Sequence, residues 1–120
     1  MEFNEQSLDN NSILALEAGQ VSLSHVQLST PCFISKSHTQ AVELTTLDQL
    51  DKRLVFELCH KDEVDLLLVG IGDTAQFLSA QQQLLIQQMG IGVESMKNDS
   101  ACRSFNLLLS DARSVGVLLL

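Results

Sequence analysis

Residues 64–72, Val-Asp-Leu-Leu-Leu-Val-Gly-Ile-Gly, decide the fold of this chain, because a nearly unbroken apolar run ends at two glycines. Such a run with little polar alternation is typical of a strand that is covered on both faces of its sheet. Ser79 is a suitable N-cap for a helix over about 80–89, and Gly90 a suitable C-terminal stop. Gly92-Val-Glu-Ser-Met96 then predicts a second, parallel strand. This segment therefore predicts a β-α-β unit at about 64–96 in an α/β fold.

The N-terminal part of the chain predicts a different arrangement. Between Ile13 and Glu43, short apolar runs alternate with polar residues and turns, which predicts a series of short antiparallel strands. Pro31 lacks a backbone N–H and belongs at a strand start or an edge. Residues 1–11 are polar and acidic, so we expect a disordered lead before a single domain over residues 12–120.

Three further elements complete the predicted domain. Apolar residues at helical spacing predict an amphipathic helix over about 46–59, with Thr45 or Thr46 as its N-cap. Asp99 or Ser100 is the expected cap of a helix that continues to about residue 111. Residues 114–119, which are nearly all apolar, predict a last strand.

Composition and charge limit the classes of function that this chain can have. Acidic residues outnumber basic ones by 15 to 7, and the formal net charge is -8. This field would repel nucleic acid and an anionic lipid surface. The apolar runs are far below the ~20 residues that span a bilayer, and the acidic start does not resemble a secretory signal. We therefore expect an acidic, soluble, cytoplasmic protein that binds no nucleic acid and makes no stable membrane insertion.

The cysteines and histidines predict no metal site. Cys32, Cys59 and Cys102 are widely separated and form no Cys-x-x-Cys pair, which favours reduced thiols. The three histidines, at positions 25, 38 and 60, show no metal-ligand spacing. They also lie outside the half of the chain that holds Cys102, so no residue is positioned to activate that thiol. We expect neither a metal nor another cofactor, and no enzymatic activity.

Two loops that meet at one edge of the predicted sheet form the candidate ligand-binding site. Gly70 and Gly72 end the first strand and permit close backbone approach. Cys102 and Arg103 are placed in the first turn of the last helix, where free N–H groups and the helix dipole favour an anion and lower a thiol pKa. Asn106 lies one turn further on. In an open α/β sheet, ligands gather outside the carboxyl ends of the strands.

A purely structural interpretation of the same residues stays open. Cys102 can pack as a small buried apolar residue, while Arg103 and Asn106 bind loop carbonyl groups together. A Gly-x-Gly without a third glycine is a weak dinucleotide signal and is equally typical of a strand-to-helix turn.

Several of these segments resemble a known family. They are Leu66-Leu-Leu-Val-Gly-Ile-Gly72, Phe77-Leu78, Met89-Gly-Ile-Gly-Val-Glu94 and Ala101-Cys-Arg-Ser-Phe-Asn106. Their order and spacing resemble a family of small uncharacterised bacterial and archaeal domains, which includes mitochondrial respiratory complex I assembly factor 3 and a vertebrate adipogenesis-associated protein. That family usually has Gly-Thr-Gly at positions 70–72 and Tyr at position 105. The resemblance implies a three-layer α/β domain with a mixed central sheet, and no established reaction.

Two functions follow as expectations. The first, which the resemblance favours, is a non-catalytic protein-binding or assembly-factor-like module that is a monomer or homodimer. The second is a binder of a small anionic metabolite at the Gly70–Gly72 and Cys102–Arg103 loops, with thiol chemistry as an extension. An exposed apolar patch with an occluded site would favour the first, and an open pocket lined by Arg103 would favour the second.

Overall fold

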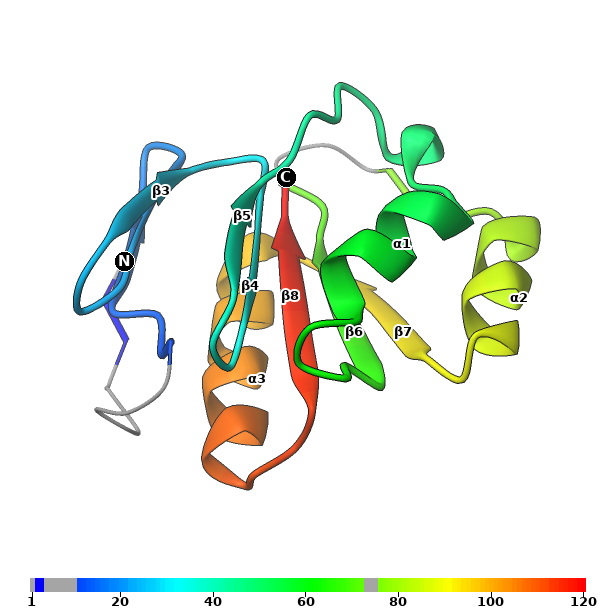
Figure 1. The fold of residues 1–120 in the computed structure, drawn as a ribbon. Coiled ribbons are helices and arrows are strands. Elements are labelled where there is room, and N and C mark those ends of the chain that lie inside the picture. Colours follow the sequence, from blue (N-terminus) through cyan, green and yellow to red (C-terminus); the bar gives the residue numbers. More distant parts are fainter. Residues whose placement is uncertain (1, 4–10, 73–75) are drawn as a thin grey trace.

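The computed structural model describes residues 2–3, 11–72 and 76–120, which form two β-sheets and the helices that cover them (Figure 1). The smaller sheet is antiparallel and has the order β1 (Ala15–Glu17), β2 (Gln20–Ser22), β3 (Gln27–Ser29). The larger sheet has the order β5 (Thr39–Ala41), β4 (Cys32–Ser35), β8 (Val115–Leu119), β6 (Leu66–Gly70), β7 (Gly92–Met96). The helical elements are the 3-10 turn η1 (Leu47–Gln49), α1 (Lys52–Cys59), α2 (Ala80–Gln88) and α3 (Asn98–Ser110).

The larger sheet is mixed and lies between two helical layers. β6 pairs in parallel with β7 and with β8, whereas β4 pairs with β8 and β5 in the antiparallel direction. Helices α1 and α2 cover one face of this sheet, and α3 covers the other (Figure 1). The predicted three-layer α/β fold with a mixed central sheet is confirmed.

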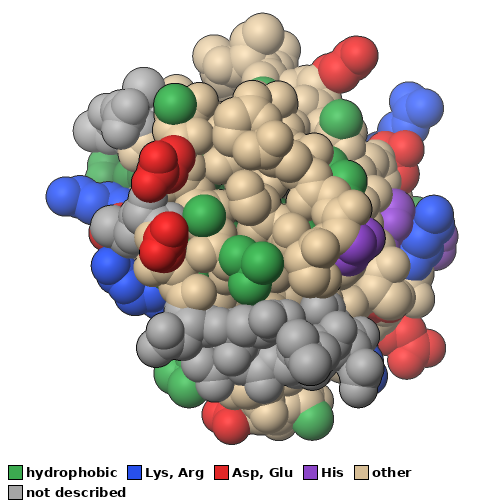
Figure 2. Space-filling view, turned by 90° about the vertical axis from the view of Figure 1, so that its left-hand side faces the viewer, with side chains coloured by type: hydrophobic (Ala, Val, Ile, Leu, Met, Phe, Trp, Pro, Cys, Tyr) green, Lys and Arg blue, Asp and Glu red, His purple; other side chains and the backbone are tan. Residues whose placement is uncertain are grey.

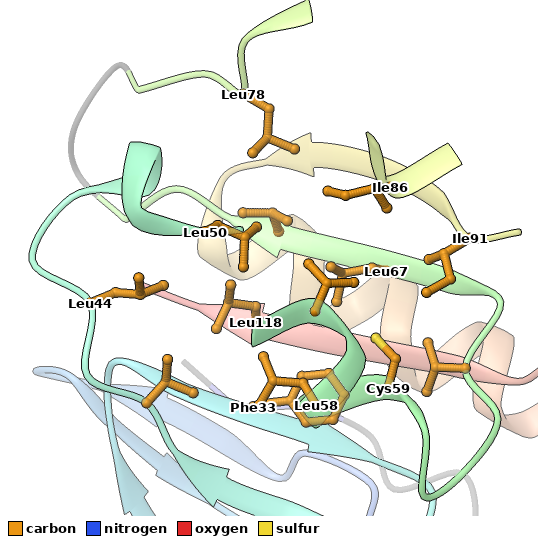
Figure 3. Packing of buried hydrophobic residues seen from close by; sticks show 14 of the residues in the cluster. Phe33, Leu44, Leu50, Leu58, Cys59, Leu67, Leu78, Ile86, Ile91 and Leu118 are labelled. Carbon is orange, nitrogen blue, oxygen red and sulfur yellow. The ribbon is translucent and has the colours of Figure 1, made fainter. Parts of the chain in front are cut away.

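Period-2 alternation divides the core into two clusters, one on each face of the sheet. On the face covered by α1 and α2, Leu67 of β6 and Leu118 of β8 pack with Phe33 of β4 (Figure 3). The neighbouring Leu68 points to the opposite face and packs with Phe105 of α3. The strand at 66–70 is therefore covered on both faces, as its apolar run predicts.

The middle of the sheet is β8 rather than β6. β8 lies between β4 and β6 and is buried along its whole length, and β6 in turn lies between β8 and β7. The crossover through α3 returns the last strand to the interior of the sheet. The β-α-β unit itself is confirmed, and Ser79 caps α2 by accepting a hydrogen bond from the Gln82 N–H at 3.1 Å.

The predicted single helix over 46–59 is divided in the structure. Thr46 begins the turn η1, but Leu50 is extended and Asp51 begins α1 as a new N-cap. The Asp51 carboxylate accepts a hydrogen bond from the Leu54 N–H at 2.9 Å. Asp51 accepts a hydrogen bond from one of the N–H groups that have no partner at the start of a helix. It therefore stabilises a new helix start directly after the break at Leu50.

The short antiparallel strands of the N-terminal third are confirmed, although they belong to both sheets. The last strand of the series expected between Ile13 and Glu43 is β5, which ends at Ala41. The expected disordered lead falls mostly on residue 1 and residues 4–10, which lie outside the described part of the chain. Its described residues Glu2 and Phe3 pair with the region of β1, where the Phe3 N–H donates to the Leu14 carbonyl oxygen at 2.8 Å.

Candidate functional site

The end of β6 and the start of α3 meet, as the sequence predicts, and Asn98 joins them. The Gly72 N–H donates to Asn98 Oδ1 at 3.1 Å. Gly72 has a φ of +69°, and a Cβ on Gly70 would collide with the Asn98 side chain, so both positions favour glycine. We did not predict a role for Asn98. The indication in the sequence was that Asn98 belongs to the polar segment before the predicted last helix.

The predicted location of Cys102 and Arg103 in the first turn of α3 is wrong. Lys97 is the N-cap, with extended backbone angles, and the helix begins at Asn98. The helix thus starts before the expected caps at Asp99 and Ser100, and its free N–H groups belong to residues that precede Cys102. Cys102 and Arg103 lie in the second turn, where the effect of the helix dipole is weak.

The Cys102 thiol is part of the core. Its side chain is 0 % exposed and packs in the cluster between the sheet and α3. Burial raises the pKa of the Cys102 thiol to about 12, Cys32 and Asp99 add to the rise, and Arg103 opposes it. The expectation of a lowered thiol pKa is therefore wrong, because desolvation disfavours the thiolate.

Arg103 and Asn106 have different surroundings. Arg103 is exposed, its Nη1 lies 3.3 Å from Asp99 Oδ2, and its guanidinium carbon lies 5.9 Å from the centre of the Phe3 ring. Asn106 is buried, its Oδ1 accepts from the Ile13 N–H at 2.8 Å, and its Nδ2 donates to the Ile13 carbonyl oxygen at 2.9 Å. Asn106 thus binds the N-terminal segment to α3, which agrees with the structural interpretation.

Replacing Asn106 by leucine is expected to destabilise the domain by about 3 kcal/mol. Leucine has a similar shape but leaves the Ile13 N–H and carbonyl oxygen buried without partners, at about 1–3 kcal/mol for each group. Urea unfolding followed by circular dichroism measures the change. Arg103→Ala, on the exposed side of the same helix, is the control and is expected to cost less than about 1 kcal/mol. An unchanged urea midpoint for Asn106→Leu would show that the paired hydrogen bonds contribute no net stability.

Two cavities lie at this end of the sheet, with volumes of about 280 Å³ and 440 Å³. Both are lined by Thr30, Gly72 and Leu120. Lys97 and Asp99 line the larger one, so an anion there would meet one charge of each sign. Cys102, Arg103 and Asn106 line neither cavity. Gly70 does not line them either, so Gly72 is the one of the five candidate residues that lies at these cavities. Binding of a small anionic metabolite between the loops therefore stays a prediction.

A polar cluster beside the β4–β5 hairpin brings serine, histidine and aspartate together. Asp62 Oδ2 accepts from Ser35 Oγ at 2.6 Å and from the Ser37 N–H at 2.8 Å, and Asp62 Oδ1 accepts from Ser37 Oγ. Burial pushes the pKa of the Asp62 carboxyl upward, but hydrogen bonds from both serines and the charge of His38 hold it below its usual value. His38 Nε2 contacts Gln40 rather than a serine hydroxyl. The aspartate is thus an acceptor that joins the hairpin to the α1–β6 connection, not a member of a nucleophilic triad.

Two further properties of the described residues concern metal binding and membrane insertion. Within residues 2–3, 11–72 and 76–120, no group of three or more His, Cys, Asp or Glu side chains can hold a metal ion. No helix in the described part of the chain has the length and apolar character to cross a bilayer.

A groove at the other end of the sheet is the second candidate site, and we did not predict it. Its volume is about 470 Å³, and its apolar lining includes Phe56, Met89 and Ile91. Phe56 is 60 % exposed and stacks on the His60 ring, with 5.1 Å between the ring centres. We call this feature the Phe56 groove. The signal in the sequence was a phenylalanine on the polar side of the predicted amphipathic helix.

Charged side chains also line the Phe56 groove. They are Lys52, Glu63 and Asp65. By contrast, on the face over the three-stranded sheet, hydrophobic side chains are scattered among polar and charged ones (Figure 2). An apolar centre with a charged border is a common form of protein-interaction surface.

Comparison with known proteins shows the family of this chain. An uncharacterised protein of Rhodobacter capsulatus is 41 % identical over 58 residues, which are 48 % of this chain and 47 % of that protein. Human NADH dehydrogenase [ubiquinone] 1 alpha subcomplex assembly factor 3 is 33 % identical over 57 residues, 48 % of this chain and 31 % of that protein. The chain thus matches less than half the length of these curated relatives.

Solved structures and a family model extend the similarity over the whole domain. The solution structure of a Bordetella pertussis protein, described as a Mth938-like domain, has a TM-score of 0.79 and 20 % identity. That match covers 100 % of this chain and 91 % of the other, and shows a shared fold. The family model described as protein of unknown function (DUF498/DUF598) matches residues 13–120. The chain therefore belongs to the DUF498/DUF598 family.

Proposed function

We propose that this domain is a non-catalytic protein-binding module of assembly-factor type, and that its partner inserts an apolar side chain into the Phe56 groove. The observation that gives this proposal its main support is the contrast between the two candidate sites. Cys102 and Asn106 are buried in structural roles, whereas Phe56 is 60 % exposed beside an apolar groove. An exposed apolar patch at one end of the sheet, together with a buried Cys102 near the other, favours a protein-binding module over a metabolite-binding one.

Three further observations support this proposal. The human relative is named as an assembly factor, a role that consists of binding other proteins. Two acidic side chains, Glu63 and Asp65, line the groove against one basic side chain, Lys52, so its net charge complements a basic residue next to the partner's apolar side chain. The net charge of -8 disfavours nucleic acid as the partner.

The free, buried thiols suit a reducing compartment, and we propose that the module acts in the cytoplasm.

Replacing Phe56 by aspartate is expected to reduce partner recovery by more than about tenfold. An aromatic side chain at the centre of an interface commonly contributes 2 kcal/mol or more to binding, and a carboxylate would also repel the acidic border of the groove. The measurement is affinity capture from the source cell, followed by quantitative mass spectrometry against the wild-type chain.

The matched control is Leu107→Asp, which places the same carboxylate at a leucine of α3 that is 61 % exposed. Arg103→Ala, at the sheet end, is also expected to leave capture intact. Proteins that are recovered equally with Phe56→Asp and wild type would rule out the groove as the interface. Loss of capture with a stably folded Arg103→Ala variant would move the functional surface to the start of α3.

A further inference from the structure

The outward side of α2 carries a narrow stripe of exposed residues, Gln81, Leu84, Leu85 and Gln88. We call these residues the α2 stripe. Leu84 is 55 % exposed and Leu85 is 37 % exposed, while Ile86 is buried against the sheet. Positions i, i+3, i+4 and i+7 lie on one side of a helix. Helix α2 lies at the end of the molecule farthest from the three-stranded sheet (Figure 1).

The orientation of the stripe is held by contacts on the opposite side of α2. Gln82 Nε2 donates to the carbonyl oxygens of Leu47 and Leu50 at 3.1 and 2.9 Å. The Ser79 N–H donates to Gln82 Oε1 at 2.9 Å and completes the capping box. Because these contacts and Ile86 attach one side of the helix to the body of the domain, Leu84 is held outward rather than exposed by chance.

The stripe lies within a segment that carries no charge. No Asp, Glu, Lys or Arg occurs at positions 74–93, in a chain with 15 acidic and 7 basic residues. A twofold interface brings the same surface of both copies together. Two acidic copies therefore repel each other least where that surface is uncharged.

The stripe is also symmetric in sequence. Residues 81–88 are Gln-Gln-Gln-Leu-Leu-Ile-Gln-Gln, so an antiparallel alignment centred between Leu84 and Leu85 places leucine opposite leucine. The same alignment places Gln81 of one copy opposite Gln88 of the other. A glutamine amide both donates and accepts hydrogen bonds, so glutamine is its own complement.

We infer that α2 is a self-association surface, through which two copies of this chain pair by antiparallel α2 helices. Leu84 and Leu85 form the apolar centre, and the Gln81–Gln88 pairs form its two ends. A helix of nine residues is short, about 14 Å long. It buries less than the ~800 Å² on each partner that a stable dimer requires. The dimer is therefore weak, with a Kd on the order of 100 µM.

Sedimentation equilibrium of the purified chain at a series of concentrations tests this pairing. Wild type is expected to shift from monomer to dimer as concentration rises, and Leu84→Glu is expected to stay monomeric. Leu107→Glu is the matched control, because Leu107 is similarly exposed but lies on α3. Thermal unfolding of each variant checks that it is folded. A wild-type monomer at every concentration, or a dimer that Leu84→Glu leaves unchanged, would overturn the inference.

Two double variants test the antiparallel arrangement. Gln81→Lys with Gln88→Glu places opposite charges across the twofold axis and is expected to lower the Kd about fivefold at low salt. Gln81→Lys with Gln88→Lys places like charges there and is expected to raise the Kd by a similar factor. Equal effects of both double variants would contradict the antiparallel pairing. This test uses the purified chain alone and other residues than the Phe56 groove, so it is independent of the proposed function.

Discussion

Replacing Leu67 by aspartate is expected to abolish the cooperative unfolding transition of the domain. Leu67 is 0 % exposed and lies in β6, which pairs with a strand on each side. Its side chain packs between the sheet and helices α1 and α2 (Figure 3). Burial of a carboxyl group here costs several kcal/mol and also removes the leucine's packing. The total stability of a domain of this size is about 5–15 kcal/mol.

Thermal unfolding followed by circular dichroism measures this effect. Leu107→Asp is the control, because the same substitution at an exposed leucine is expected to change stability by about 0.5 kcal/mol or less. A cooperative transition of Leu67→Asp near the wild-type temperature would show that the two-sided burial of β6 is incorrect.

Alkaline pH is expected to destabilise the domain strongly through its buried thiols. Burial raises the pKa values of Cys32, Cys59 and Cys102 from 9.0 to about 12. Below pH 9 each thiol is neutral in both states, so its full contribution to stability is present. Between pH 9 and pH 12 the unfolded chain releases these protons while the folded chain keeps them, and stability falls. By pH 10 the stability that each thiol contributes falls by roughly 1–2 kcal/mol, or on the order of 4 kcal/mol for the three together.

The composition makes this alkaline effect easy to isolate. The chain has no tyrosine, and its lysines, at positions 36, 52, 61 and 97, are all exposed. Urea unfolding at pH 8, 9 and 10 in the presence of a reductant gives the slope of stability against pH. Cys59→Ala is expected to lower the whole curve but to remove about a third of the slope. A slope that is the same in wild type and in Cys59→Ala would contradict the burial of that thiol.

Local patterns in the sequence determined which elements form and which faces they bury. The apolar run at 66–70 predicts a strand covered on both faces, and Leu67 and Leu68 do pack into different clusters. Ser79 marks the start of α2 because an N-cap acts on N–H groups within three residues. The glycines at 70 and 72 mark the strand end for an equally local reason. Such features are predictable because the groups that cause them are neighbours in the chain.

The order of the strands and the chemistry of the candidate sites were decided only by tertiary structure. The chain alone does not show that β8 lies between β4 and β6, because that pairing joins segments far apart in sequence. Helix α3 begins two or three residues before the expected position, and Cys102 lies in the core rather than at a helix end. Burial by residues that are distant in sequence raises the pKa of the Cys102 thiol, whereas its position along the chain predicted a lowered pKa. Asn98 binds Gly72, and Phe56 and Met89 line the same groove, only because the fold brings together segments that are far apart in sequence.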